Sequence, residues 1–328
     1  MVGAVFLASS VGAFAQQASQ SDNTRIRTKS PLSDRSRLPQ ALQNVPLEHL
    51  SSGALMLLDR DGDLVEWPAA SAAPATGPGP SLETATAATA VALDPRVGTN
   101  IRLGNDPIVL PPTMRAQAEP HIARALNNPN LLLATFQEGR LTTAGAVDCG
   151  FSISRNGGLS WSRALIPGLT PTSGGPYFRA TDPVAAVNAG GALFLCTLAA
   201  TEVNFARGVV LVSRSLDGGA TFAAPRVAYR APNNTVFPDK NWIAINTFPG
   251  TPTFGRIVVT FTLFGSGSTA DGAPLARTYS DNGGITWSAP AFIHPAITNA
   301  QGSQPVFLPN GKLAVVYWNF GTPRSPGE

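Results

Sequence analysis

Short apolar runs separated by turn-forming residues dominate the second half of the chain. Four runs rich in leucine, β-branched and aromatic residues each follow a turn built from Asn, Gly or Pro; they span 131–136, 192–198, 256–264 and 312–318. Alternation of this kind is typical of strand–hairpin–strand units. No helical periodicity extends beyond a few turns. The pattern therefore predicts an all-β protein from about residue 99 onward.

A polar residue followed by a few apolar residues opens each of these units. The opening segments begin at Glu119, Asp182, Asp239 and Gln304. After the hairpin comes a longer link, a third β-rich run, a glycine-containing turn and a fourth run. Each unit is thus expected to form four antiparallel strands, which is the composition of a propeller blade.

One eight-residue pattern marks the turn between the third and fourth runs. It reads Ser-x-Asp/Asn-x-Gly-x-Ser/Thr-aromatic and recurs at intervals of about 60 residues. Asp or Asn accepts hydrogen bonds from nearby backbone N–H groups, and glycine adopts positive φ without a steric penalty, so the pattern predicts a tight hairpin. The closing aromatic side chain can pack between neighbouring sheets. The defining residues are Ser154, Asn156, Gly158 and Trp161; Ser215, Asp217, Gly219 and Phe222; and Ser280, Asn282, Gly284 and Trp287.

This pattern resembles the Asp box, or BNR repeat, of sialidase-like β-propellers. The resemblance implies a β-propeller of four-stranded antiparallel blades. Six or seven blades are expected in a full protein of this type, and about three and a half in this chain. In that family the box lies at the end of the blade away from the active site, so we expect all three copies to be structural. The rival interpretation is a closed four-bladed ring in which an N-terminal strand completes the last blade.

The N-terminal part of the chain has a different composition. Residues 1–15 are apolar and end Ala13-Phe14-Ala15, which resembles the core and cleavage site of a secretory signal peptide. The apolar run is shorter than a stable membrane span requires. Residues 16–98 are expected to be low in complexity and largely disordered, because the stretch 69–92 within them is mostly Ala, Pro, Thr, Ser and Gly. Residues 99–328 then form the partial propeller. We expect a secreted protein, extracellular or periplasmic.

Charge and cysteine content exclude several function classes. The net charge of +3 is small for 328 residues and forms no basic stripe, which argues against nucleic-acid binding. Metal-ligand spacings, phosphate-binding loops and dinucleotide fingerprints are absent from the sequence, so no metal and no cofactor are expected. Cys149 and Cys196 fall in predicted strands of adjacent blades, where buried thiols or a disulfide would both fit. The pattern does not determine the oligomeric state.

Candidate ligand-binding residues cluster at the unit openings, because the innermost strands of a propeller begin at one mouth of its central channel. Acids and bases gathered in such a half-enclosed funnel perturb one another's pKa values, as sugar-binding and hydrolytic sites require. Capping of strand ends is the other interpretation. The candidates are Glu119, His121, Asp182, Asp239, Lys240 and Gln304, joined by Arg140 and Arg179 from adjacent segments.

The resemblance to sialidases implies specific roles. Those enzymes hold the sialic acid carboxylate with three arginines and use a tyrosine–glutamate nucleophile and an aspartate acid/base. The position matching their Arg-Ile-Pro motif reads Glu119-Pro120-His121, without an arginine, whereas Glu138-Gly139-Arg140 resembles the stretch ahead of their acid/base loop. Asp148 is the candidate acid/base, and Arg140 and Arg179 would hold a carboxylate. The implied function is a secreted sialidase-type glycoside hydrolase acting on terminal, glycan-borne sugars; the alternative is a non-catalytic propeller that binds glycans or proteins.

Overall fold

The regular structure in the described part of the chain is almost entirely β-strand. The computed structural model describes residues 100–103, 116–141, 145–201, 207–233, 236–264, 273–294 and 299–321. Within these ranges the regular elements are β-strands and one three-residue 3-10 helix, η5 (Pro171–Ser173). The predicted signal peptide at 1–15 and the low-complexity segment at 16–98 lie outside the described residues.

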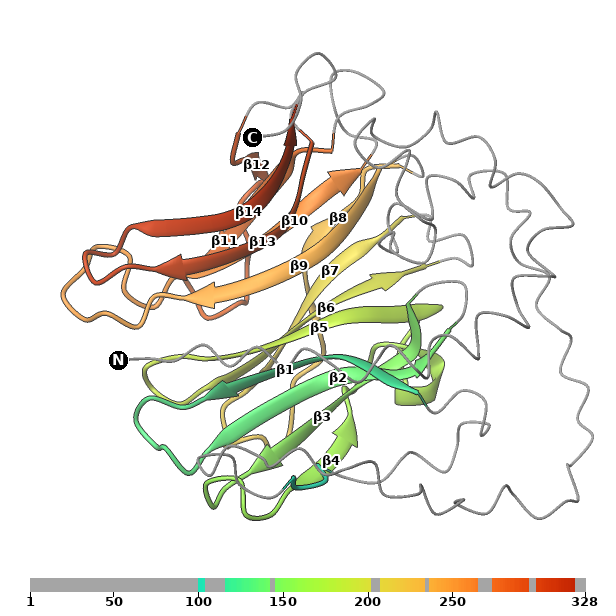
Figure 1. Ribbon diagram of the computed structural model, residues 1–328, viewed down its shortest axis with the longest axis vertical. Helices are drawn as coiled ribbons and strands as arrows, with labels where there is room; N and C mark the ends of the chain where they lie inside the picture. Colours follow the sequence, from blue (N-terminus) through green and yellow to red (C-terminus); the bar gives the residue numbers. More distant parts are fainter. Residues whose placement is uncertain are drawn as a thin grey trace, which may run out of the picture.

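The strands form three complete four-stranded units and one pair, fanned out in chain order (Figure 1). Within each unit consecutive strands pair antiparallel, so the prediction of four-stranded antiparallel blades is confirmed. β13 and β14 pair only with each other among the described strands, and a strand that would complete the last blade in the alternative four-bladed ring lies outside the described residues, so that alternative stays a prediction. The strands are β1 (Gln117–Arg124), β2 (Leu132–Arg140), β3 (Ala146–Ser154) and β4 (Ser162–Leu165); β5 (Arg179–Val187), β6 (Leu193–Ala200), β7 (Val209–Ser215) and β8 (Arg226–Arg230); β9 (Phe237–Ile245), β10 (Ile257–Phe264), β11 (Leu275–Ser280) and β12 (Ala291–Phe292); and β13 (Asn299–Phe307) and β14 (Leu313–Gly321).

Apolar layers between adjacent blades hold the fan together. One layer joins the first and second blades and contains Leu133 and Ile153, and another joins the second and third blades and contains Phe194 and Phe261. Strand β6 is buried along its whole length because it faces both layers, and β10 is buried because it faces the second layer on one side and packs Val258 near Phe307 of the fourth unit on the other. Cys149 and Cys196 lie in these layers as buried free thiols, not as a disulfide.

Each Asp box forms the hairpin between the third and fourth strands of its blade, as predicted. The serine hydroxyl accepts a hydrogen bond from the second glycine of the turn, at 2.8 Å in the first and second boxes and 2.9 Å in the third. The Asp or Asn side chain accepts the N–H of the later Ser or Thr at 2.9–3.0 Å. The turn is thus closed by side chains that replace missing backbone partners.

Contacts across the boxes join each blade to the next. Arg155 of the first box donates to the carbonyl of Gly218 in the second at 2.9 Å, and Arg214 donates to Gly283 of the third at 3.0 Å. The ring of Phe222 packs edge-on against Phe151 of the preceding blade, with centroids 4.9 Å apart. The boxes therefore stabilise the blade-to-blade interfaces as well as their own hairpins.

A β-bulge interrupts every innermost strand at the same place. The first bulge residue has a left-handed backbone in all four blades: φ is 51° at Glu119, 48° at Asp182, 51° at Lys240 and 69° at Gly302. This register corrects the sequence alignment of the unit openings. Asp239 is equivalent to Thr181, one residue before the bulge, and Gln304 is equivalent to His121, directly after it. The sequence alignment is wrong at these two positions because the hydrophobic pattern does not mark which residue begins the bulge.

Candidate functional site

The bulges gather charged side chains at one end of the innermost strands, opposite the Asp boxes. Left-handed backbone costs a non-glycine residue on the order of 1 kcal/mol or more, and such strain persists where surrounding structure imposes it. Here Glu119, Asp182 and Lys240 occupy the strained position in three successive blades, while the fourth has Gly302. We call Glu119, Asp182 and Lys240, together with Gln137 and Arg140 of β2, the mouth cluster.

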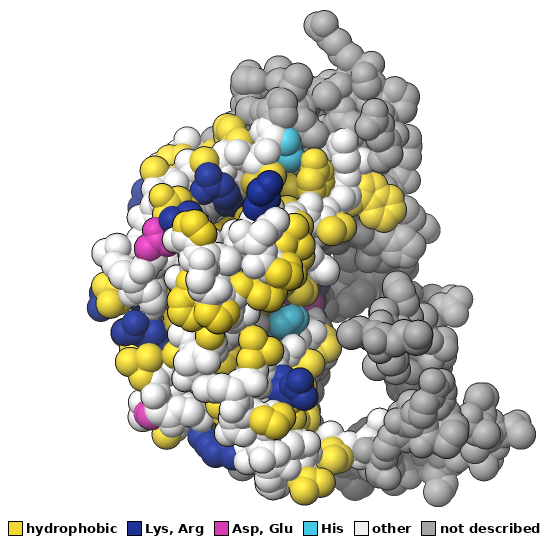
Figure 2. Space-filling model, turned by 90° about the vertical axis from the view of Figure 1, so that its left-hand side faces the viewer, with side chains coloured by type: hydrophobic (Ala, Val, Ile, Leu, Met, Phe, Trp, Pro, Cys, Tyr) yellow, Lys and Arg dark blue, Asp and Glu magenta, His cyan; other side chains and the backbone are white. Residues whose placement is uncertain are grey.

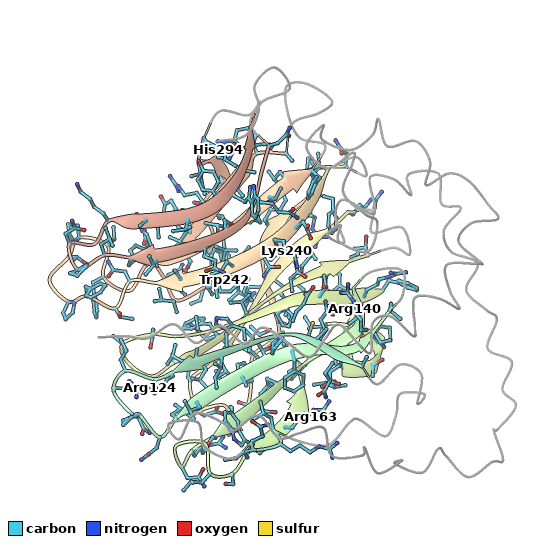
Figure 3. The ribbon with its side chains drawn as sticks, viewed as in Figure 1. Arg124, Arg140, Arg163, Lys240, Trp242 and His294 are labelled. Carbon is cyan, nitrogen blue, oxygen red and sulfur yellow. The ribbon has the colours of Figure 1, made fainter. Side chains whose placement is uncertain are left out.

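Glu119 is the hub of the mouth cluster. Its Oε1 lies 3.3 Å from Lys240 Nζ and 3.6 Å from a guanidinium nitrogen of Arg140. Its Oε2 accepts a 2.8 Å hydrogen bond from Gln137 Nε2. Figure 3 labels Lys240 on β9 and Arg140 at the end of β2, which flank β5 from opposite blades. One carboxyl group thus connects the first and third blades.

Asp182 is the buried partner of this hub, with a side chain only 4% exposed. Its Oδ2 accepts the backbone N–H of Lys240 at 3.0 Å, and its Oδ1 accepts the hydroxyl of Thr181 at 2.9 Å and lies 3.8 Å from Lys240 Nζ. The bulge at Asp182 is therefore bound to the bulge at Lys240 by both backbone and side chain.

The two carboxyl groups have opposite pKa shifts. Burial raises the pKa of Glu119 to about 8, and the charge of Asp182 and a hydrogen bond to it add to the rise. Burial also disfavours ionised Asp182, but Lys240 and the hydrogen bonds from Glu119 and Thr181 outweigh it and lower the pKa of Asp182. The pKa of Lys240 is raised, chiefly by Asp182. The two groups titrate as a coupled pair in which Glu119 is the more basic carboxyl.

Three further predicted residues lie on the inner strands without joining the hub. His121 accepts the N–H of Ala185 at its Nδ1, at 3.1 Å, and packs edge-on against Trp242 with ring centroids 5.0 Å apart. Burial lowers the pKa of His121, so its ring is neutral near pH 7. Asp239 accepts a 2.7 Å hydrogen bond from Gln301 Nε2 and so links the third blade to β13. Gln304 is exposed on β13.

Asp148 and Arg179 are buried within the blades. Asp148 lies on β3, accepts the N–H of Cys149 at 2.7 Å and the hydroxyl of Thr170 at 2.5 Å, and has no exposed surface. Burial raises its pKa. Arg179 is 1% exposed and lies with its guanidinium 5.5 Å from the ring centroid of Phe178. The acid/base role of Asp148 and the carboxylate-binding role of Arg179 stay predictions.

Sequence analysis missed two residues that organise the mouth cluster. Gln137 Nε2 donates to both Glu119 and the hydroxyl of Thr181, and its Oε1 accepts from Arg140 at 3.0 Å. Neither residue belongs to a repeated pattern. The sequence signal that could have indicated them is their position next to candidate site residues. Gln137 directly precedes Glu138-Gly139-Arg140, and Thr181 directly precedes Asp182.

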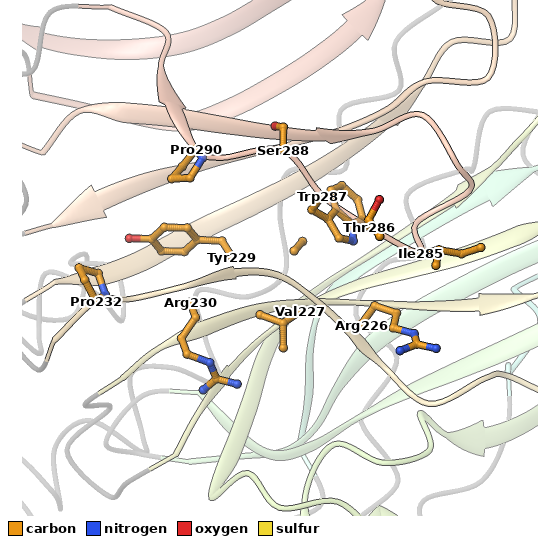
Figure 4. A pocket seen from close by; sticks show the side chains of 11 residues that line it. Arg226, Val227, Tyr229, Arg230, Pro232, Ile285, Thr286, Trp287, Ser288 and Pro290 are labelled. Carbon is orange, nitrogen blue, oxygen red and sulfur yellow. The ribbon is translucent and has the colours of Figure 1, made fainter.

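Three other features of the described residues concern metal ligands, a surface groove and membrane-spanning helices. Across the described residues no group of three His, Cys, Asp or Glu side chains is arranged to hold a metal ion. A groove of about 560 Å³ lies away from the mouth cluster, between β8 and the third Asp box (Figure 4). Tyr229, Trp287, Pro232 and Pro290 contribute to its walls. Within the described ranges, no helix has the length and apolar character needed to cross a bilayer.

Comparison with known proteins agrees with the blade architecture. The profile of the BNR/Asp-box repeat family matches residues 278–289, which include the whole of the third box, Ser280 to Trp287. The blades and their hairpins are those of an Asp-box β-propeller. No curated protein matches this Asp-box chain.

Several solved structures resemble the Asp-box chain at low identity. A protein of unknown function from Dyadobacter fermentans is 15% identical with a TM-score of 0.47, over 62% of this chain and 57% of that one. The Hadza microbial sialidase Hz136 is 17% identical with a TM-score of 0.46, over 65% and 45%. The GH93 α-L-arabinofuranosidase of Fusarium graminearum is 13% identical with a TM-score of 0.47, over 66% and 61%. The aligned part of this chain thus spans about half of each structure.

Proposed function

We propose that this protein is a glycoside hydrolase whose reaction centre is the mouth cluster. The observation that carries the proposal is the placement of Glu119 and Asp182 at equivalent bulges of adjacent blades, both within 4 Å of Lys240 Nζ, where the pKa of Glu119 is raised and that of Asp182 is lowered. A carboxyl group that keeps its proton near pH 7 can protonate the leaving oxygen of a glycosidic bond.

The contact between the two carboxyl groups determines their roles. Asp182 raises the pKa of Glu119 through its charge and a hydrogen bond, and both carboxyl groups lie within 4 Å of Lys240 Nζ, so the two groups titrate together. The pair therefore acts as one proton-donating unit. Glu119 carries the proton, Asp182 raises its pKa, and Lys240 keeps Asp182 ionised. The group that attacks the anomeric carbon is a separate residue or a water molecule.

The finer proposal is a secreted sialidase-type enzyme that removes terminal acidic sugars. Arg140 ends the stretch that resembles the sialidase Glu-Gly-Arg segment, and its guanidinium and the Lys240 ammonium both lie within 4 Å of Glu119 Oε1. Their combined positive charge would attract a sugar carboxylate. The apolar segment 1–15, with its Ala-Phe-Ala end, supports export.

The test uses the purified chain, a panel of fluorogenic glycosides that includes a sialoside, and the variant Glu119→Gln. We expect at least one substrate to be cleaved and Glu119→Gln to lower kcat by about 100-fold or more, with KM changed only a few-fold. Asp217→Asn in the second Asp box is the control and should keep full activity. Equal kcat values for wild type and Glu119→Gln would exclude Glu119 as the proton donor.

A non-catalytic glycan-binding propeller is the second candidate function. It is favoured by the contact between Glu119 and Asp182, which prevents this pair from serving as separate acid and nucleophile. In that case no glycoside of the panel is cleaved, glycans bind on a microarray, and Lys240→Ala abolishes the binding.

A further inference from the structure

The Asp-box end of the molecule is a continuous face formed by hairpins from every blade. We define it as the turns β1–β2, β5–β6, β9–β10 and β13–β14 together with the three boxes, which all lie at one end because first and third strands run in the same direction. The first box contacts the β1–β2 turn through the N–H of Gly157 and the carbonyl of Asn130, at 3.0 Å. Thr253 of the β9–β10 turn donates to the carbonyl of Gly311 in the β13–β14 turn at 3.1 Å.

Charge is segregated between the two ends of the described structure. The carboxyl groups of Glu119, Asp182 and Asp239 are at the mouth end, and those of Glu138 and Asp148 are buried where β2 ends and β3 begins. Among the described residues the Asp-box end has two carboxylates, Asp217 and Asp281, and Asp281 is neutralised by a two-pronged pair with Arg256 at 2.7 and 2.8 Å. The basic side chains at this end are Arg124, Arg155, Arg214, Arg226, Arg256 and Lys312. Figure 2 faces this end and shows dark blue patches with little magenta.

Exposed aliphatic side chains project between these cations. Leu159 in the first box is 78% exposed and Leu216 in the second is 72% exposed. Ile285 in the third box and Leu126 in the β1–β2 turn are also exposed. The boxes do not need these residues, because their hydrogen bonds come from the Ser, Asp or Asn and Gly positions. Their position among the cations of one face, at successive hairpin tips, would let the same surface bury apolar groups and pair its cations at once.

We propose that the Asp-box end binds the surface of an anionic lipid membrane. Aliphatic tips among arginines are the composition that inserts at a bilayer interface, with side chains entering the acyl boundary and guanidinium groups pairing with phosphates. A soluble polyanion would use the cations but not the leucines, and an acidic protein would need a concave or flat apolar centre instead of separate tips. Membrane docking at this end directs the mouth cluster away from the bilayer. The inference does not depend on catalysis.

Vesicle co-sedimentation of the whole chain tests the proposal. The probes are phosphatidylcholine vesicles with and without about one-third phosphatidylserine. The double variant Leu159→Ser/Leu216→Ser removes two aliphatic tips, and Arg124→Gln/Lys312→Gln removes two exposed cations. Val306→Ser/Val316→Ser is the matched control, because both valines are exposed on the β13–β14 pair and outside the hairpin tips. Thermal unfolding confirms that each variant is folded.

We expect binding to the phosphatidylserine vesicles, reduced about tenfold by either the leucine or the cation double variant and unchanged in the valine control. Failure of the wild type to bind anionic vesicles would overturn the proposal. So would wild-type affinity in the leucine variant, which would mean that a polyanion or headgroup charge alone is recognised. Equal loss in the valine control would likewise overturn it by showing nonspecific apolar adsorption.

Discussion

Lys240 contacts Asp182 twice, donating its backbone N–H to Oδ2 at 3.0 Å while its ammonium lies 3.8 Å from Oδ1. The backbone contact exists only because both residues lie in bulges with φ near 50°. The innermost strands of two blades are thereby fixed at the point where their charged side chains meet. Arrangement of the mouth cluster thus depends on backbone conformation as much as on side-chain chemistry.

The first prediction separates the contributions of the two cations. Lys240→Gln should raise the pKa of both Asp182 and Glu119, because the ammonium lowers both. Arg140→Gln should raise the pKa of Glu119 while leaving Asp182 nearly unchanged, since Arg140 acts on Glu119 alone. Carboxyl-carbon NMR titration measures both values. An unchanged Asp182 in Lys240→Gln would contradict the assigned ion pair.

Stability should depend on pH through Glu119. The pKa of its carboxyl rises from an ordinary 4.5 to about 8 on folding, so between these values the folded state binds more protons than the unfolded state. The free energy of unfolding should therefore fall as the pH rises from about 4.5 to about 8, and this contribution should level off above that range. Urea unfolding at a series of pH values measures the slope. Glu119→Gln should flatten it, and parallel curves for the two proteins would contradict the prediction.

Within an Asp box the serine should matter more than the aspartate. Ser215 is buried and accepts the buried N–H of Gly219 at 2.8 Å, so Ser215→Ala should destabilise by about 1–2 kcal/mol. Asp217 is exposed, and water can replace the hydrogen bonds that it accepts from Thr221 and Ser215, so Asp217→Ala should cost less. Denaturant unfolding of the two variants compares them directly. A larger loss for Asp217→Ala would reverse the assignment.

Two adjacent glycines of the second box form a matched pair. Both have positive φ, but a Cβ on Gly219 would lie 1.8 Å from Ile153 Cδ1 in the preceding blade, whereas no described residue other than its chain neighbours lies within 4 Å of a Cβ on Gly218. Gly218→Ala should cost only backbone strain, about 1 kcal/mol. Gly219→Ala should cost clearly more because it forces the two blades apart. Similar unfolding midpoints for the two variants would contradict this prediction and would show that the blade interface adjusts to accommodate the added methyl group.

The blade framework could be predicted from the sequence because its signals are local. Ser154, Ser215 and Ser280 begin hairpins whose turn chemistry is complete within eight residues, and the strands between them follow from apolar runs and turns. The mouth cluster was predicted only partly. Glu119, Asp182, Lys240 and Arg140 do meet, but Asp239 was aligned one position out of register because nothing marks Lys240 as the residue that adopts a left-handed backbone. The burial of Asp148 was not predictable either, since it depends on Thr170, which lies in a link without periodicity.

The two arginine contacts between Asp boxes suggest how the blades can diverge in sequence. The acceptor is the same in both, the carbonyl of the fourth box residue, Gly218 or Gly283. The donors differ, because Arg155 is the second residue of its box while Arg214 directly precedes its own. Every amino acid has a backbone carbonyl, so a duplicated blade keeps the hydrogen-bond acceptor of this contact whatever side chains it later acquires. The contact then requires only an arginine close enough to donate to that carbonyl, and more than one position in the preceding blade meets this requirement.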